Sequence, residues 1–449
     1  MLRALLTALL GLWLPFAAVA GQVSTFRLDN GLEAVVIEDR RAPIAVHMVW
    51  YRVGAADEAP GKSGIAHYLE HLLFKGTETL APGEFSATVA AEGGRDNAFT
   101  SHDYTGYFQS VAADRLETMM RMEADRMRNL RLSEEDARTE LRVILEERAQ
   151  QVESEPGSLF TEQRQAIQFL NHPYGIPVIG WRHEMERLTR QDALDFYRTY
   201  YAPNNAVLIV AGDVDPTEVR RLAEKHYGAL APTSDLPPRM RPQEPPQLAE
   251  RRFTLRDARV GQPYMIRSYL APARQTGDQR EAAAIEVLAE LLGGSGLTSV
   301  LGRKLELGAG VAVSTGSFYD AVSLDPSSFG LFVMPAAGVS LADAEAALDL
   351  ALAEFLAEGV DPEALGRVKT QVRAQVIYDQ DSAMGQAMRM GRALTAGLTV
   401  ADVEAWPGIL QEVTAEDVIA AAQALFDPRR SVTGYLERAG TPAGMEVVQ

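Results

Sequence analysis

The sequence predicts an α+β protein made of two related α/β-sandwich domains, each with helices packed on a mixed or antiparallel sheet, joined by a proline-rich linker. Patterns typical of strands and of helices are mixed in both halves of the 449-residue chain. Residues 231–246 are rich in proline and lack an apolar period, as interdomain linkers often do. One segment of the second half can also be aligned with a segment of the first half without a gap.

The first half opens with strand patterns. Asn30-Gly31 lies between two alternating segments, which is a signal for a β-hairpin. A helix that carries histidines follows the third strand, and long helices continue as far as residue 152. The expected strands occupy residues 24–39 (as the hairpin), 44–54, 104–112 and 205–214.

The second half again mixes strands with helices, and one of its helices repeats a pattern of the first half. Residues 188–207 align with residues 413–432. Each copy predicts a helix with a threonine N-cap, then a proline, then a strand. We therefore expect a duplicated α+β unit, although two capped helices can also resemble each other by chance. The coinciding pairs are Thr189 with Thr414, Asp192 with Asp417, and Pro203 with Pro428.

The first 20 residues have the pattern of a secretory signal peptide. Arg3 precedes an apolar run that ends in Ala18-Val19-Ala20, which predicts cleavage before Gly21. An uncleaved membrane anchor has the same pattern, but no later apolar run is long enough to span a bilayer. We expect an exported, periplasmic protein of a Gram-negative bacterium. Its expected units are the signal peptide (1–20), an N-terminal domain (21–230), the linker (231–246) and a C-terminal domain (247–449).

Composition excludes several kinds of partner and site. The net charge of −18 argues against nucleic acid and anionic membrane surfaces as partners. The chain has no cysteine, which excludes disulfides, a thiolate nucleophile and cysteine-ligated zinc. A metal ion would therefore have to be held by His, Asp or Glu side chains.

The stretch GIAHYLEHLLFKGT, residues 64–77, brings two imidazoles and a carboxylate within five residues. On a helix, His67 and His71 lie one turn apart on one face, and Glu70 lies beside them. The opposite, core-facing side carries Ile65, Leu69 and Leu72. Two histidines at this spacing can bind Zn²⁺ from one helix, and the carboxylate can take a proton from water. We predict that His67 and His71 are zinc ligands and that Glu70 is the general base, rather than members of an ordinary surface helix.

A third ligand is needed, and the best candidate lies in SEEDARTELRVILEERAQQ, residues 133–151. Glu140 and Glu147 fall close together in the middle of the predicted inward arc, whereas Glu146 points to solvent. Two carboxylates facing inward are costly unless a cation meets them. We predict Glu147 as the third ligand and Glu140 as a residue that orients a histidine. The arc is defined by Ala137, Leu141, Val143 and Ile144.

The segments HYLEHLLFKGT, NAFTSHDYTGYF and ELRVILEE resemble the inverted-zinc-motif peptidases, the family of pitrilysin, insulin-degrading enzyme and mitochondrial processing peptidase. The family's third ligand and its second acid fall on Glu147 and Glu140 of this chain. The resemblance implies a zinc endopeptidase with one Zn²⁺ per chain that cuts extended or unfolded peptides, although Mn²⁺ or Co²⁺ also suits such ligands. It also implies that Asn97, Ala98 and Phe99 belong to an edge strand that binds substrate.

One departure from the family concerns an Arg and a Tyr, seven residues apart, that bind substrate in many members. Glu306 and Val313 stand at those places, and Arg303 and Tyr319 are nearby but wrongly spaced. The resemblance therefore implies the metal-bearing subunit of a two-subunit enzyme, whose partner supplies the Arg/Tyr pair; the alternatives are a homodimer and a monomer that uses other groups. Two other functions stay open: a non-catalytic peptide-binding or assembly subunit, and a zinc hydrolase with a non-peptide substrate.

Overall fold

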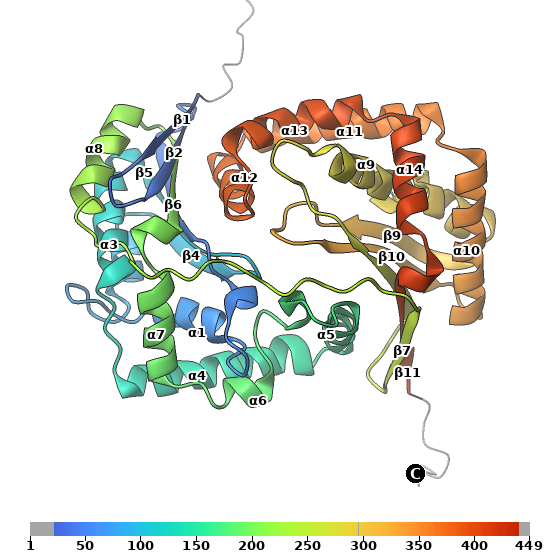
Figure 1. Ribbon diagram of the computed structural model, residues 1–449, viewed down its shortest axis with the longest axis horizontal. Coiled ribbons are helices and arrows are strands. Elements are labelled where there is room, and N and C mark those ends of the chain that lie inside the picture. Colours follow the sequence, from blue (N-terminus) through green and yellow to red (C-terminus); the bar gives the residue numbers. More distant parts are fainter. Residues whose placement is uncertain (1–21, 295, 440–449) are drawn as a thin grey trace, which may run out of the picture.

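The structure is a computed structural model that describes residues 22–294 and 296–439. The predicted signal peptide lies outside the described residues. The strands before the linker build one lobe and those after it build a second, coloured blue to green and yellow to red in Figure 1. No helix in the described part of the chain is long and apolar enough to cross a membrane.

The first sheet, within the described residues, has six strands in the order β1-β2-β6-β3-β5-β4. Its neighbours are antiparallel except for β2 and β6, which run parallel. The predicted turn at Asn30-Gly31 joins β1 to β2, and Gly31 has a φ of 91°, which glycine adopts without strain. The strands are β1 (Val23–Arg27), β2 (Glu33–Glu38), β3 (Ile44–Tyr51), β4 (Arg95–Thr100), β5 (Thr105–Ala112) and β6 (Ala206–Gly212).

The second sheet has five strands in the described residues, in the order β7-β11-β8-β10-β9. Again one pair, β7 with β11, is parallel and the others are antiparallel. The strand order therefore repeats that of the first sheet from β2 to β4. The strands are β7 (Arg251–Asp257), β8 (Tyr264–Ala271), β9 (Ala312–Tyr319), β10 (Ser327–Pro335) and β11 (Ser431–Arg438).

Helices pack on both sheets, as the predicted α+β class requires. Those before the linker are α1 (Ile65–Leu72), α2 (Glu84–Ala91), α3 (Leu116–Arg128), α4 (Glu134–Arg148), α5 (Pro156–Gln168), α6 (Arg182–Met185), α7 (Arg190–Tyr200) and α8 (Pro216–His226). Those after it are α9 (Arg280–Ala289), α10 (Leu341–Glu358), α11 (Pro362–Gln380), α12 (Ala383–Thr395), α13 (Val400–Glu412) and α14 (Ala415–Leu425). A short π-helix, η8 (Gly302–Gly308), precedes β9.

The predicted repeat has the same local structure in both halves. Helix α7 leads through a 3₁₀ turn into β6, and α14 leads through a 3₁₀ turn into β11. Each helix begins with a capping box, formed by Thr189 with Asp192 and by Thr414 with Asp417. Strand β6 then pairs in parallel with β2, and β11 pairs in parallel with β7. The two segments therefore have equivalent positions in their sheets.

The two halves also exchange a helix. Helix α12 from the second half packs on β3 and β6 of the first sheet, and α5 from the first half packs on β7, β8 and β11. Gly391 of α12 lies so close to the buried Trp50 that a Cβ there would be 2.1 Å from the indole. On the other side, the ring of Phe160 stacks on Phe253 at 5.2 Å. Each sheet is therefore covered by a helix that the other half supplies.

Residues 231–250 contain no helix or strand and run between the two lobes. Arg241 in this segment donates hydrogen bonds to Asp57 and Asp103 of the first half and to Asp325 of the second, at 2.9, 2.6 and 3.1 Å. Arg239 adds a second pair with Asp57 at 3.0 Å. The linker is therefore fastened to both lobes by buried or half-buried ion pairs.

Candidate metal centre

Helices α1 and α4 lie against each other and bring together His67, His71 and Glu147. One ligand-type atom from each of these three residues lies within 4.8 Å of the other two. The Oε2 atom of Glu147 is 3.4 Å from Nε2 of His71 and 3.7 Å from Nε2 of His67. These separations exceed those of good hydrogen bonds. Two donor atoms that each lie about 2.0–2.1 Å from one tetrahedral ion are roughly 3.4 Å from each other, and the observed separations match this value.

Three local features hold α1 in place. The carboxylate of Glu58 accepts hydrogen bonds from the backbone N–H groups of Gly64 and Ala66, at 2.9 and 2.8 Å, and so caps the first turn. The hydroxyl of Tyr68 donates to the carbonyl of Ala137 on α4, at 2.6 Å. The predicted core side of α1 is buried, namely Ile65, Leu69 and Leu72.

Helix α4 starts at a capping box formed by Ser133 with Asp136. Ile144 is fully buried and Glu146 is exposed, both as expected. The expectation that Val143 faces inward is wrong, because its side chain is 44% exposed. The buried arc is centred further round the helix, so Glu147 lies at its edge rather than in its middle. Its side chain stays 26% exposed, and this position turns the carboxylate toward the open space beside α1.

Glu147 and His71 are each oriented by a second side chain. The Oε1 atom of Glu147 accepts a hydrogen bond from Nε2 of Gln151 at 2.9 Å, which leaves Oε2 facing the histidines. Nδ1 of His71 lies 2.9 Å from Oε1 of Glu140, the residue expected to orient a histidine, so that Nε2 faces Glu147. Lys75 forms an ion pair with the other oxygen of Glu140.

The surroundings act on the pKa values of these groups in opposite directions. Burial lowers the pKa of His67 to about 4, and the neighbouring His71 adds to this, so the ring is neutral. Burial also disfavours the charged form of His71, but the hydrogen bond that His71 donates to Glu140 and the charges of nearby carboxylates outweigh burial and raise the pKa of His71. Burial raises the pKa of Glu140, and His71 and Lys75 reverse this and lower it. Nδ1 of His67 is buried and has no hydrogen-bond partner in the described residues.

Glu70 lies beside the three residues and is buried. Its Oε2 atom accepts a hydrogen bond from the hydroxyl of Thr100, the last residue of β4, at 2.6 Å. Burial raises the pKa of Glu70; the hydrogen bond from Thr100 and the charge of His71 offset part of this rise. A carboxylate with a raised pKa is suited to accept and return a proton near neutral pH.

Strand β4 lies at the edge of the first sheet and, in the described residues, pairs only with β5. Alternation along the strand turns Ala98 and Thr100 toward α1. Phe99 faces the other side, where its ring packs edge-on against Trp50 at 4.7 Å. Asn97 is exposed, and its Oδ1 accepts the backbone N–H of Ala98. The three residues predicted to contact substrate therefore offer a free backbone edge beside Glu70, while the ring of Phe99 is used in packing.

The residues at the family's Arg/Tyr places have other contacts. Glu306 on η8 accepts hydrogen bonds from the backbone N–H and the hydroxyl of Thr315, at 2.8 and 2.6 Å. Val313 on β9 is exposed. The hydroxyl of Tyr319 donates to the carbonyl of Pro272, and Arg303 lies 3.9 Å from Asp361. None of these contacts joins the residues to His67, His71 or Glu147.

Sequence reasoning missed several residues that position the site. Thr100 donates a hydrogen bond to Glu70, Gln151 donates one to Glu147, and Glu58 caps α1. Thr100 lies in the NAFTS segment, and Gln151 follows Glu147 by one helical turn, so both have a signal in the sequence. Glu58 precedes its helix by a loop, and no periodicity points to it.

Comparison with known proteins gives consistent matches. The family model described as "Insulinase (Peptidase family M16)" matches residues 34–181, and the one described as "Peptidase M16 inactive domain" matches residues 187–372. The zinc protease PqqE of Helicobacter pylori is 30% identical over 416 residues, with 91% of each chain covered.

Solved structures have the same fold. The crystal structure of a protease from Helicobacter pylori has a TM-score of 0.87 at 26% identity, and the match covers 93% of this chain and 100% of that one. The periplasmic protease PqqL from Escherichia coli has a TM-score of 0.81 at 21% identity, which shows the fold alone; the match covers 92% of this chain and 47% of that one. With two M16-type domains and a relative of this identity along nearly its whole length, the chain belongs to the M16, or insulinase, family of peptidases.

Proposed function

We propose that this chain is a zinc-dependent endopeptidase that cuts extended or unfolded peptides. The observation that carries the proposal is the convergence of His67, His71 and Glu147 on one point, with the buried carboxylate of Glu70 beside them. Two neutral imidazoles and a carboxylate are a common ligand set for catalytic zinc. The relatives named as zinc proteases support the same metal.

In this proposal His67, His71 and Glu147 hold the ion. A bound zinc supplies a Lewis acid that makes water a nucleophile at neutral pH and polarises a carbonyl. Glu70 takes the proton from the attacking water and returns it to the leaving amine. Thr100 holds one oxygen of Glu70, which fixes the direction of the other. Glu140 keeps the proton of His71 on Nδ1 and so leaves Nε2 free to bind the metal.

The substrate would bind as an added strand on the free edge of β4, along Asn97, Ala98 and Phe99. An unpaired strand edge offers backbone N–H and C=O groups to an extended peptide of almost any sequence. Because Thr100 of the same strand donates to Glu70, a peptide on this edge lies next to the proton acceptor.

We further propose that the chain is the metal-bearing subunit of a two-subunit enzyme. Glu306 and Val313 stand where many family members have the substrate-binding Arg and Tyr, so a second family subunit would supply that pair; a homodimer is the alternative. The Escherichia coli protease, of which this chain covers 47%, supports an arrangement in which such a fold forms half of a larger assembly. The predicted signal peptide favours the periplasm as its location.

Metal analysis and one substitution test the enzyme. Purified protein should contain one zinc per chain and should cleave an unfolded peptide until a chelator is added. The Glu70→Gln variant should keep its zinc and lose at least about 10²-fold in kcat, because only the proton acceptor is removed. Undiminished cleavage by Glu70→Gln would remove this residue from its role. Zinc and peptide binding without turnover, alone or with every candidate partner, would favour the non-catalytic subunit instead.

Co-purification tests the partner. Proteins that bind the chain in an extract of its own cell envelope should include a second family member, and adding that protein should raise the rate of peptide cleavage. Hydrolysis at a rate that no partner changes would contradict the two-subunit proposal.

A further inference from the structure

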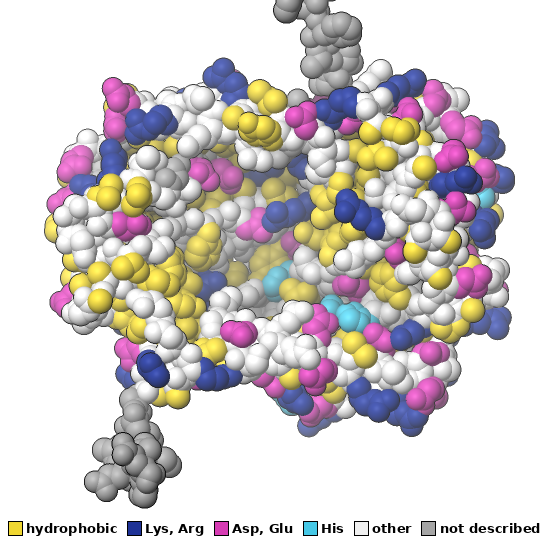
Figure 2. Space-filling view, turned by 180° about the vertical axis from the view of Figure 1, so that it is seen from behind, with side chains coloured by type: hydrophobic (Ala, Val, Ile, Leu, Met, Phe, Trp, Pro, Cys, Tyr) yellow, Lys and Arg dark blue, Asp and Glu magenta, His cyan; other side chains and the backbone are white. Residues whose placement is uncertain are grey.

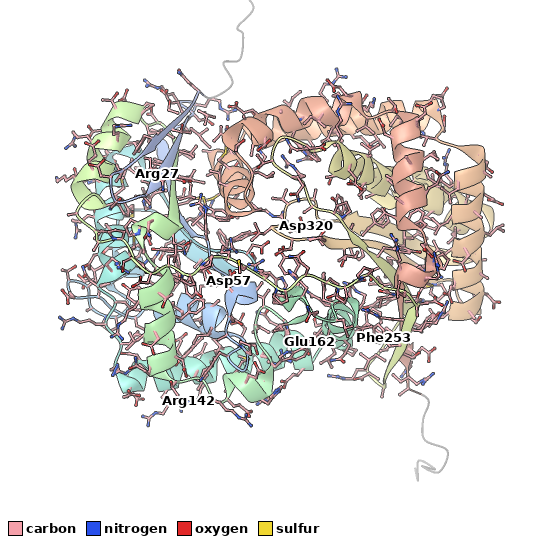
Figure 3. All side chains as sticks on the ribbon, in the orientation of Figure 1. Arg27, Asp57, Arg142, Glu162, Phe253 and Asp320 are labelled. Atoms are coloured by element: carbon pink, nitrogen blue, oxygen red, sulfur yellow. The ribbon has the colours of Figure 1, made fainter. Side chains whose placement is uncertain are left out.

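A cavity of about 340 Å³ lies between the two lobes, next to the end of β4. From the first half of the chain, its wall includes Ser101 and Tyr104, which flank the β4–β5 turn, and Arg164 of α5. From the second half, it includes Phe318 at the end of β9 and Arg392 of α12. Asp320, labelled in the space between the lobes in Figure 3, lies on the same wall. Figure 2 shows that the molecule is hollowed between its lobes, with charged and histidine side chains around the hollow.

Arg164 is a buried cation that forms no ion pair within the described residues. Its side chain is 8% exposed, and its Nε and Nη1 atoms are buried and make no hydrogen bond in the described residues. Burial lowers the pKa of Arg164, and the charge interaction with Tyr264 offsets only part of this effect. The guanidinium lies 5.6 Å from the ring centroid of Phe318, a weak cation–π contact that leaves its N–H groups unsatisfied.

Four other buried arginines of the described chain each have an acidic or amide partner, although Nη1 of Arg126 and Nε of Arg148 also lack a hydrogen bond. Arg126 binds Glu123, Arg148 binds Glu162, Arg267 binds Glu345, and Arg274 binds Gln279. The contrast is sharpest on α5 itself, where Glu162 pairs with Arg148, whereas Arg164 turns to the cavity and forms no ion pair in the described residues. An unpaired buried guanidinium is costly, and such groups are kept where a ligand supplies the missing partner.

The acids around the cavity are already neutralised. Asp320 accepts two hydrogen bonds from Arg392, both at 2.6 Å. Asp103 is bound by Arg241 and by the hydroxyl of Tyr174. The charge left over at this place is therefore the positive charge of Arg164. A cavity of this size, with aromatic walls and one unpaired guanidinium, fits a carboxylate on a short side chain or at a chain end.

We propose that this cavity binds a carboxylate of the peptide substrate through Arg164, so that the chain prefers peptides with an acidic group at a defined distance from the scissile bond. The inference rests on the proposed function, because the peptide is taken to lie along β4. Ser101 in the cavity wall directly follows Thr100. From Asn97 to Ser101 an extended strand covers roughly 13 Å, so the carboxylate lies about four residues from the residue that pairs with Asn97.

A positional scan of peptides tests this. Fluorescent ten-residue peptides of neutral, unstructured sequence carry one Glu that is moved along the chain, and each has a Gln counterpart. Binding is measured by anisotropy to the full-length protein loaded with zinc and carrying Glu70→Gln, so that turnover is not required. At one position of the scan the Glu peptide should bind about tenfold more tightly than its Gln counterpart, the size of one charge-assisted hydrogen bond. Amidated peptides show whether the C-terminal carboxylate is the group that binds.

Substitutions assign the preference to Arg164. Arg164→Gln should bring the Glu/Gln ratio close to one, and Arg164→Lys should keep part of it. Arg142→Gln, which removes the same charge from the exposed outer surface of α4 (Figure 3), should leave the ratio unchanged. A ratio that survives Arg164→Gln, or that is lost with Arg392→Gln instead, would overturn the assignment.

Two further outcomes keep the inference separate from the proposed function. If Arg164→Gln does not fold, the intact chain still decides, because equal binding of Glu and Gln peptides at every position contradicts the inference. Cleavage of peptides without any acidic preference would overturn this inference alone. If the chain that keeps Glu70 binds acidic peptides preferentially but cleaves none of them, the proposed function is contradicted and the carboxylate site is not.

Discussion

Replacing Glu140 by glutamine tests how the candidate metal centre orients His71. One carboxylate oxygen of Glu140 faces Nδ1 of His71 at 2.9 Å, and the other is paired with Lys75. Glutamine has one acceptor, so it cannot serve both neighbours. If its oxygen stays on Lys75, its NH₂ group faces Nδ1 and favours the tautomer in which Nε2 carries the proton. That tautomer cannot bind a metal through Nε2.

The size of the effect follows from this conflict. Losing a carboxylate behind a metal-binding histidine weakens metal affinity about 10–100-fold, or about 1.4–2.7 kcal/mol. We expect Glu140→Gln to raise the zinc Kd by this factor, measured by competition with a chromophoric chelator at neutral pH. Glu146→Gln is the matched control, because it removes an equal charge from an exposed position on the same helix and should change the Kd less than about twofold.

A double substitution separates orientation from general damage. With Lys75→Met added to Glu140→Gln, the amide oxygen is free to face Nδ1 of His71, and zinc affinity should recover in part. The melting temperature of the zinc-free variants shows whether the helices stay folded. Equal zinc Kd values for Glu140→Gln and Glu146→Gln, or no recovery in the double variant although it folds, would refute the role of Glu140.

Two other substitutions test the packing of the halves. Gly391→Val should lower the free energy of unfolding by about 1–3 kcal/mol, because its Cβ would lie 2.1 Å from the indole of Trp50. The control is Gly366→Val on α11, where the side chain meets open space and only the intrinsic cost of valine in a helix is measured. An equal loss of stability in both variants would contradict the packing argument. Burial raises the pKa of Asp325, but His172 and Arg241 outweigh it and lower that pKa to about 2. The stabilisation, roughly 1 kcal/mol after solvent screening, is therefore present above pH 4 and is lost as the pH falls toward 2. The unfolding free energy of Asp325→Asn should fall less steeply over this range than that of the parent, and parallel curves would count against the ion pair.

Local signals in the sequence predicted local structure well. The turn at Asn30-Gly31 forms, and Thr189 and Thr414 cap their helices as expected. In each case residues close in the chain decide the backbone through their own hydrogen bonds or φ preference. The face of α1 was predictable for the same reason, because a single apolar stripe defines which side is buried.

The error at Val143 shows the limit of that reasoning. A helical wheel ranks positions by the apolar side chains around them, and Val143 widened the predicted arc of α4 toward the wrong side. The structure buries Ala137 and Ile144 and leaves Glu147 at the rim. A metal ligand belongs at such a rim, since it needs the core on one side for rigidity and open space on the other for substrate. Periodicity alone could not distinguish the rim from the middle of the arc.

The exchange of α5 and α12 could not be predicted, because it depends on contacts between distant parts of the chain. Buried positions on α5 include Phe160, Glu162 and Arg164, a mixture that has no single interpretation on a helical wheel. Phe160 packs on the second sheet, Glu162 pairs with Arg148, and Arg164 faces the interdomain cavity. Each neighbour comes from a different element, so only the three-dimensional arrangement explains the sequence.

That exchange also gives the second half a physical role, although it has no counterpart of the His-Glu-His cluster. All seven residues of β6 are buried, which a sheet with one open face would not produce. The second layer comes from α12, whose Ala387 and Met390 pack on the same cluster as Trp50 and Ile209. The sheet that carries β4 is therefore completed by the other half. The same helix contributes Arg392 to the cavity beside β4, so the duplicated domain shapes the proposed substrate site while the first domain carries the candidate metal ligands.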